Sequence, residues 1–113
     1  MHELAITESI VKSAVPKAQA AGAKRILTIN LKLGELSDIV PSCIEHYLQY
    51  AAKGTLAEGA KIHVGRIPVR IKCRDCLRDS EIKRHTFTCP ECGSSNIELI
   101  QGREYYIDSL EVE

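Results

Sequence analysis

Apolar residues recur at spacings of three and four along residues 4–21, the pattern of an amphipathic helix. The apolar positions of this stripe are Ile10, Val11, Ala14, Val15, Ala18 and Ala21. Gly22 provides a stop signal, and Pro16 predicts a kink because proline lacks a backbone N–H, although the stripe continues through it in phase. A second helix is predicted to begin at Pro41 and to stop at Gly54, with a broad apolar face. Its apolar positions are Ile44, Tyr47, Leu48, Ala51 and Ala52.

Between and after these helices, apolar and polar residues alternate in a period of two, which is typical of strands. Residues 26–33 predict the first strand, with Leu27, Ile29, Leu31 and Leu33 on its buried face. Residues 61–72 predict a second strand region, in which a change of phase indicates a bulge at Gly65 or Pro68. Residues 103–112 have strand propensity and are expected to return to the main sheet.

These elements predict an α+β fold with a small sheet of about three strands packed by two helices. We expect residues 1–72 plus 101–113 to form this domain and residues 73–100 to form an inserted zinc-binding lobe. With 113 residues, 44% of them hydrophobic, the chain can bury one modest core. The insertion is too short to hold itself together by packing, so it needs another source of stability.

Four cysteines in the insertion supply that source. Cys73 and Cys76 form one Cys-x-x-Cys pair, and Cys89 and Cys92 form a second, with twelve residues between the pairs. Each two-residue gap lets a turn of backbone present two thiolates to one ion, and two such turns complete a tetrahedral Zn(II) site. Four thiolates leave zinc no open position, which predicts a structural role.

Charge and composition exclude several functions. The fifteen basic and fifteen acidic residues balance, so no global field favours nucleic acid or an anionic membrane. No signal peptide and no membrane span are visible, and five cysteines, four at zinc spacing, predict a reducing compartment, the cytoplasm. We find no nucleophile with its base, no glycine-rich phosphate loop and no carboxylate pair, so no enzyme activity is predicted.

The N-terminal residues Met1, His2 and Glu3 form a second candidate metal site. The bulky His2 favours retention of Met1, whose amine is partly neutral at neutral pH and can act as a ligand. With the amide nitrogen and the imidazole of His2 it offers three nitrogens in one plane, which suits Ni(II) or Cu(II). Glu3 could supply a fourth donor. The same residues also fit an ordinary frayed helix start, with Glu3 favourable to the helix dipole.

Other candidate ligands are isolated. Cys43 and His46 lie three residues apart on the second predicted helix, but a cysteine there also fits a small buried hydrophobe. His63 falls on the exposed face of a strand, and His85 lies four residues before Cys89, where it could tune the zinc site. Their roles stay open on sequence grounds.

Several motifs in order along the chain together resemble the HypA/HybF family of hydrogenase maturation factors. They are Met1–Ile6 (MHELAI), Gly34–Ser37 (GELS), Gly54–Ala60 (GTLAEGA), the two cysteine pairs with Cys89–Ser94 (CPECGS), and Leu110–Glu113 (LEVE). The likeness runs the whole length of the chain, whereas a cysteine ribbon alone fits many unrelated proteins. Pro16 and Cys43 depart from the family pattern and touch none of the proposed ligands.

The resemblance implies a nickel metallochaperone that delivers Ni(II) during maturation of [NiFe]-hydrogenase and, in some organisms, of urease. It implies nickel at His2 with Met1 and Glu3, structural zinc at the four cysteines, and an α+β nickel lobe beside a small zinc lobe. The implied partners are the nickel-binding GTPase HypB, the [NiFe]-hydrogenase large-subunit precursor and urease maturation proteins.

Two other classes of function fit parts of the sequence. A zinc-ribbon adaptor could bind nucleic acid through basic residues around the cysteines, although the net charge is neutral and Phe87 is the one aromatic residue in the lobe. A thiol oxidoreductase could use either Cys-x-x-Cys pair, although two matched pairs favour zinc. Oligomeric state, nickel affinity and the surface that binds partners do not follow from the sequence.

Overall fold

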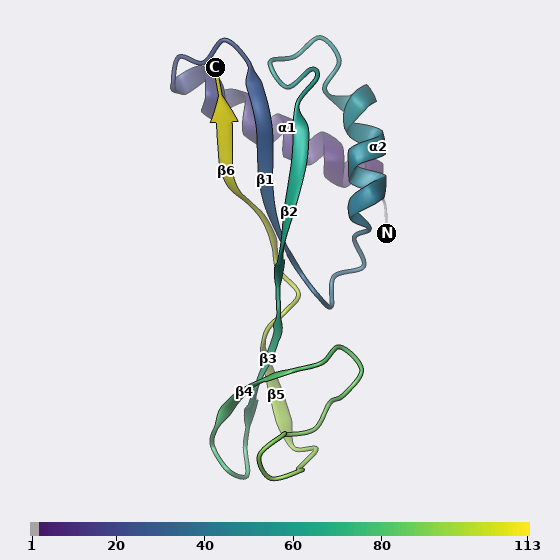
Figure 1. Ribbon diagram of the computed structural model, residues 1–113, viewed down its shortest axis with the longest axis vertical. Coiled ribbons are helices and arrows are strands. Elements are labelled where there is room, and N and C mark those ends of the chain that lie inside the picture. Colours follow the sequence, from purple (N-terminus) through teal and green to yellow (C-terminus); the bar gives the residue numbers. More distant parts are fainter. Residues whose placement is uncertain (1–2) are drawn as a thin grey trace. The chain divides into compact units, whose positions relative to one another are not determined.

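The structure is a computed structural model that describes residues 3–113 (Figure 1). The elements within that range are α1 (Glu3–Ala20), β1 (Ile26–Gly34), α2 (Pro41–Ala51), β2 (Lys61–Ile67), β3 (Val69–Cys73), β4 (Asp79–Ile82), β5 (Ile97–Gln101) and β6 (Tyr105–Val112). The chain forms two compact units. Unit 1 holds the described residues up to Leu31, Asp38–Gly65 and Tyr106–Glu113, and unit 2 holds Lys32–Ser37 and Arg66–Tyr105.

Unit 1 contains the predicted combination of two helices and a small sheet, in strand order β2-β1-β6, which confirms the α+β class. In Figure 1, β1 and β2 run in the same direction and α2 connects them, whereas β6 runs the opposite way. A helix is the usual connection between parallel neighbours, because the chain must cross back before the second strand begins. No helix of residues 3–113 has the length and hydropathy to span a membrane.

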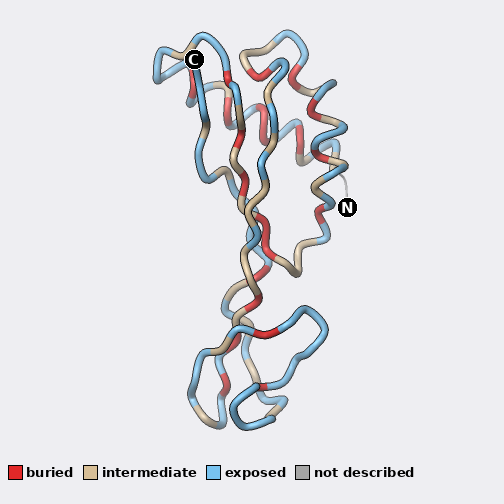
Figure 2. The backbone as a smooth tube through the Cα atoms, viewed as in Figure 1, coloured by how far each residue is buried: buried red, intermediate tan, exposed pale blue. Residues whose placement is uncertain are grey.

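The core of unit 1 lies between the helices and β1, and the buried positions in Figure 2 follow these elements. Its members include Ile10, Val11, Ala14, Ala18, Ile26, Ile29, Leu31, Ile44 and Leu48. Leu27 was expected on the buried face but is 39% exposed, while Ile26 is buried. The strict alternation fails at the start of β1, where the Ile26 N–H donates to the carbonyl of Leu56 (2.8 Å). Pro16 lies inside α1, and the helix continues through it to Ala20.

Unit 2 contains a second sheet in the order β4-β3-β5, which the sequence pattern did not predict. β3 pairs antiparallel with both neighbours, so that Ile71 lies opposite Ser80 on one side and Leu99 on the other. Pro68 separates β2 from β3, and an irregularity in the pairing with β5 falls between Arg70 and Ile71. The small core consists of Val69, Ile71 and Ile82, with Leu36, Ile97 and Leu99 packed against it.

Residues 32–37 join unit 2 through hydrogen bonds to distant parts of the chain. The N–H of Gly34 donates to the carbonyl of Glu104 (2.7 Å), and the N–H of Leu36 donates to that of Gly102 (2.8 Å). The N–H of Glu35 donates to the carbonyl of Ile67 (2.9 Å). Leu36 therefore packs on the core of unit 2 although it is encoded between β1 and α2.

Candidate metal centre

The two Cys-x-x-Cys pairs fold into matching turns. In the first, the N–H of Leu77 donates to the carbonyl of Cys73 (2.9 Å), and the N–H of Cys73 donates to that of Arg78 (2.9 Å). In the second, the N–H of Gly93 donates to the carbonyl of Cys89 (2.8 Å), and the N–H of Cys89 donates to that of Ser94 (2.8 Å). The same two backbone hydrogen bonds thus close each turn.

All four sulfur atoms meet at one point of unit 2. Every pair of these Sγ atoms lies within 4.8 Å, and the distance is 3.6 Å between Cys73 and Cys92 and also between Cys76 and Cys89. A tetrahedral site with Zn–S bonds of about 2.3 Å has S···S edges of about 3.8 Å. The donor set and its spacing therefore fit a tetrahedral thiophilic ion such as Zn(II), held without another ligand.

The thiols differ in acidity. The pKa of Cys73 is lowered from its ordinary 9.0 to about 7, chiefly because the backbone N–H of Cys76 donates to its sulfur, and burial opposes this shift. The N–H of Ser94 acts to lower the pKa of Cys92, but the contact with Cys73, burial and the other two thiols outweigh it and raise that pKa to about 12. Cys73 is therefore the first of these two to offer a thiolate to an incoming metal.

A polar network joins the two turns beside the sulfurs. The carboxylate of Asp75 accepts hydrogen bonds from the Ser94 hydroxyl and from Nδ2 of Asn96 (3.2 Å), and the former lowers the pKa of Asp75 most. Arg78 pairs with Glu91 at 3.3 Å. Because each bond links one turn to the other, the network holds the two cysteine pairs together. The sequence reading missed it, since bonds between turns depend on the tertiary fold.

Leu77 occupies the position in the first turn that Gly93 occupies in the second. Both adopt a left-handed backbone, with φ of 62° at Leu77 and 76° at Gly93. Glycine adopts this conformation freely, whereas a residue with a β-carbon pays about 1–2 kcal/mol. Leu77 is 72% exposed, so burial within this chain does not offset that cost. In the sequence, a leucine follows Cys76 where a glycine follows Cys92, and this difference could have indicated the strain at Leu77.

The structure describes one of the three residues proposed to bind nickel. Met1 and His2 lie outside the described residues, and Glu3 begins α1 in unit 1. The carbonyl of Glu3 accepts a hydrogen bond from the buried Thr7 hydroxyl (2.6 Å). Thr7 therefore stabilises the first turn of α1, which begins at Glu3.

The isolated candidates are not members of the sulfur cluster. Within residues 3–113, Cys73, Cys76, Cys89 and Cys92 form the only group of three or more potential ligands close enough to share an ion, and neither Cys43 nor any histidine belongs to it. His63 and His85 are exposed, and His46 packs edge-on against Tyr47 and Tyr50, at ring distances of 5.4 and 5.6 Å.

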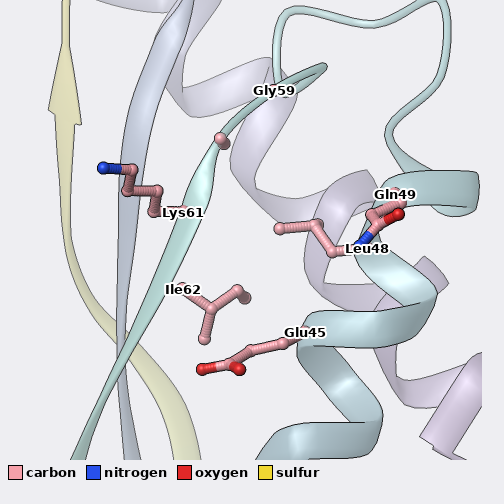
Figure 3. A pocket seen from close by; sticks show the side chains of 7 residues that line it. Glu45, Leu48, Gln49, Gly59, Lys61 and Ile62 are labelled. Carbon is pink, nitrogen blue, oxygen red and sulfur yellow. The ribbon is translucent and has the colours of Figure 1, made fainter.

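The surface of unit 1 also has a hollow of about 420 Å³ between α2 and β2. Its labelled lining residues are Glu45, Leu48, Gln49, Gly59, Lys61 and Ile62 (Figure 3). The Lys61 side chain points away from the other labelled side chains. Glu45 is the one lining residue with a carboxylate. The hollow therefore lacks a set of metal ligands and contains none of the sequence-predicted site residues.

Comparison with known proteins gives a likeness over the whole chain. A family model described as "Hydrogenase/urease nickel incorporation, metallochaperone, hypA" matches residues 1–112. Hydrogenase maturation factor HypA of Moorella thermoacetica is 37% identical over 113 residues, with full coverage of both chains. The HypA of Dehalococcoides mccartyi is 38% identical over 113 residues, covering 100% of this chain and 95% of its own.

Solved structures share the fold. The solution structure of the Ni metallochaperone HypA from Helicobacter pylori superposes with a TM-score of 0.69 at 23% identity, covering 99% of this chain and 97% of its own. A second HypA solution structure has a TM-score of 0.74 at 23% identity, covering 100% and 97%. At this identity the likeness supports the α+β fold, and the relatives of higher identity support the family.

Proposed function

Because the chain belongs to the HypA family of nickel-incorporating hydrogenase maturation factors, we propose that it binds Ni(II) at its N-terminus and delivers it during maturation of [NiFe]-hydrogenase. Members of this family are maturation factors and metallochaperones, and the chain is accordingly not an enzyme. The observation that carries the proposal is a family match that begins at residue 1 and therefore includes Met1, His2 and Glu3.

The chemistry of these three residues supports Ni(II) as cargo. The Met1 amine, the His2 amide nitrogen and the His2 imidazole form adjoining five- and six-membered chelate rings, and nitrogen donors in one plane suit Ni(II). The carboxylate of Glu3 could be the fourth ligand of Ni(II). Alternatively, the fourth coordination position could accept a ligand from the receiving protein. A site with one exchangeable position can release its ion to a partner, as delivery requires.

We propose Zn(II) as the resident metal of Cys73, Cys76, Cys89 and Cys92. Structural zinc contributes about 10–16 kcal/mol in small domains at neutral pH, and the small core of unit 2 makes such a contribution necessary. A complete thiolate set leaves no position for catalysis. Zinc would thus stabilise unit 2, and the cargo would bind elsewhere.

The proposed partners follow from this role. They are the nickel-binding GTPase HypB, with which the protein would work, and the [NiFe]-hydrogenase large-subunit precursor, which would receive the nickel. The family description also names urease, so urease maturation proteins are a further candidate. A cytoplasmic location is part of the proposal, and it is supported by the need to keep thiols reduced if they are to hold zinc.

Calorimetric nickel titration of untagged, zinc-loaded protein tests the proposal against two variants. His2→Ala removes the imidazole, and an N-terminal tag removes the free amine while leaving His2 in place. We expect one site per chain in the untagged protein, with a square-planar or octahedral absorption spectrum, and at least about tenfold weaker binding in both variants. Zinc content and far-UV circular dichroism should not change. Equal nickel affinity in all three proteins would place nickel elsewhere.

A further inference from the structure

The hollow between α2 and β2 lies along an open edge of the sheet in unit 1. β2 is the outermost strand in the order β2-β1-β6, so one side of its backbone has no strand neighbour within residues 3–113. Residues 61–65 of this strand belong to unit 1, together with every residue that lines the hollow. The strand sequence, KIHVGRI, contains no proline, a residue that often protects an edge from further pairing. This edge can therefore accept one more extended segment.

The lining of the hollow suits one apolar and one positively charged side chain. Leu48, Ala60 and Ile62 give it apolar surface, and its volume of about 420 Å³ lies in the range of ligand pockets. The Glu45 carboxylate reaches from α2 toward β2 beside Ile62 (Figure 3). Within the part of the chain that the structure describes, this carboxylate makes no hydrogen bond or ion pair. Since Lys61 points away, the hollow presents an uncompensated negative charge next to apolar surface.

We propose that the hollow and the edge of β2 bind an extended segment of a partner protein, in which an apolar residue lies two positions from a lysine or arginine. The segment would pair with β2 as a fourth strand. Residues two apart on a strand point to the same face, so the apolar side chain would enter the hollow while the basic one pairs with Glu45. Main-chain hydrogen bonds to β2 would supply affinity, and the two side chains would supply specificity. This binding goes beyond nickel delivery and does not depend on it.

A second copy of this chain fits the edge less well. The other open edge of the sheet in unit 1 is β6, which carries Asp108 and Glu111 and would bring negative charge to Glu45. Two copies of β2 paired antiparallel over the whole strand would place Pro68 of one copy opposite Ala60 of the other. Proline has no N–H to donate, so this pairing would end beside the hollow. A separate basic segment has neither restriction.

Peptide titration followed by NMR tests the inference on zinc-loaded, nitrogen-15-labelled full-length protein. The probe is the blocked peptide acetyl-Thr-Thr-Leu-Thr-Lys-Thr-Thr-amide, and a second peptide has glutamate in place of the lysine. We expect amide shift changes in β2 and α2 and slower hydrogen exchange of β2 amides. The lysine peptide should bind about fivefold more tightly than the glutamate peptide, as one exposed ion pair allows.

Charge reversal at Glu45 gives the matched test. Glu45→Lys should reverse the preference, so that the glutamate peptide binds more tightly than the lysine peptide. Glu8→Lys makes the same charge change at an exposed position of α1 and should keep the wild-type preference. Equal affinity of the wild type for both peptides, no binding of either, or shift changes confined to other strands overturns the inference.

Sedimentation equilibrium without peptide tests the competing occupant. We expect a monomer, or a dimer whose formation leaves the β2 amide signals unchanged. A dimer that shifts these signals would mean that a second copy covers the edge, and this result also overturns the inference. Nickel is absent from all of these measurements, so failure of the proposed function would be seen separately, in the nickel titration.

Discussion

The backbones of Gly34 and Gly102 are in direct contact, since a β-carbon on Gly34 would lie 2.1 Å from the carbonyl oxygen of Gly102. That same oxygen accepts the Leu36 N–H (2.8 Å). Gly102 has a φ of 131°, and a β-carbon there would come within 3.2 Å of the Val69 Cα. Gly34 therefore allows residues 32–37 to reach unit 2, where Leu36 packs on the core.

Gly34→Ala should destabilise unit 2 by about 2–4 kcal/mol, because the added methyl meets backbone that cannot rotate away. The matched control is Gly54→Ala, at a φ of 77° with nothing within 4 Å of the added carbon, which should cost only about 1–2 kcal/mol of backbone strain. Denaturant unfolding of the zinc-loaded variants measures both values. An equal cost for the two would show that the contact relaxes without penalty.

Loss of one zinc ligand should affect unit 2 selectively. Cys73→Ala or Cys92→Ala should abolish stoichiometric zinc and disorder residues 66–105, since the apolar cluster around Val69 is small. Backbone amide NMR signals of α1 and β1 residues in unit 1 should persist. Cys43→Ala is the control and should retain one zinc per chain. One zinc per chain in either ligand variant would show that the four-cysteine assignment is incorrect.

Protons should compete with zinc in a pH-dependent way. With a lowered pKa of about 7, Cys73 of chelator-treated protein loses its proton between about pH 6 and pH 8, whereas Cys92, with a pKa of about 12, keeps its own. Zinc binding should therefore release roughly one proton fewer at the upper end of this range, and zinc affinity should rise with pH throughout. Calorimetry in buffers of different ionisation enthalpy counts the protons. A constant count would contradict the acidity of Cys73.

Glu104 should titrate at a low pH. The backbone N–H of Gly102 donates to its Oε1 (2.7 Å), and this is the main reason why the pKa of Glu104 falls below its ordinary 4.5. A lowered folded-state pKa means that the bond's contribution to stability is present above pH 4.5 and is lost as the pH falls through the lowered value. Carboxyl carbon NMR shifts of zinc-loaded protein give the pKa. An ordinary or raised value would show that the bond is absent in solution.

The elements of unit 1 were predictable because each carries a long local pattern. α1 and α2 have apolar stripes at helical spacing, and β1 alternates over most of its length. The phase error at Ile26 and Leu27 falls where the N–H of Ile26 donates to the carbonyl of Leu56 in a distant loop. Tertiary contacts of that kind leave no mark in a local hydrophobic pattern.

The structure of unit 2 was less predictable because it depends on contacts between residues that are far apart in the sequence. β4 and β5 have four and five residues, too few to show a period, and they form by pairing with β3. The cysteine spacing indicated a shared ion, but the links from Asp75 to Ser94 and Asn96 and the bonds made by residues 34–36 need the folded chain. Nickel binding by Met1 and His2 stays a prediction, since those residues lie outside the described range.

The sheet order β2-β1-β6 has a consequence for synthesis on the ribosome. Residues of β6 from Tyr106 onward belong to unit 1 and are translated after every residue of unit 2. The sheet of unit 1 therefore gains its last strand only after the four cysteines and both edge strands of the second sheet have been translated. Unit 1 can therefore complete its sheet only late in synthesis, and pairing between residues as far apart as Arg25 and Glu113 slows its folding.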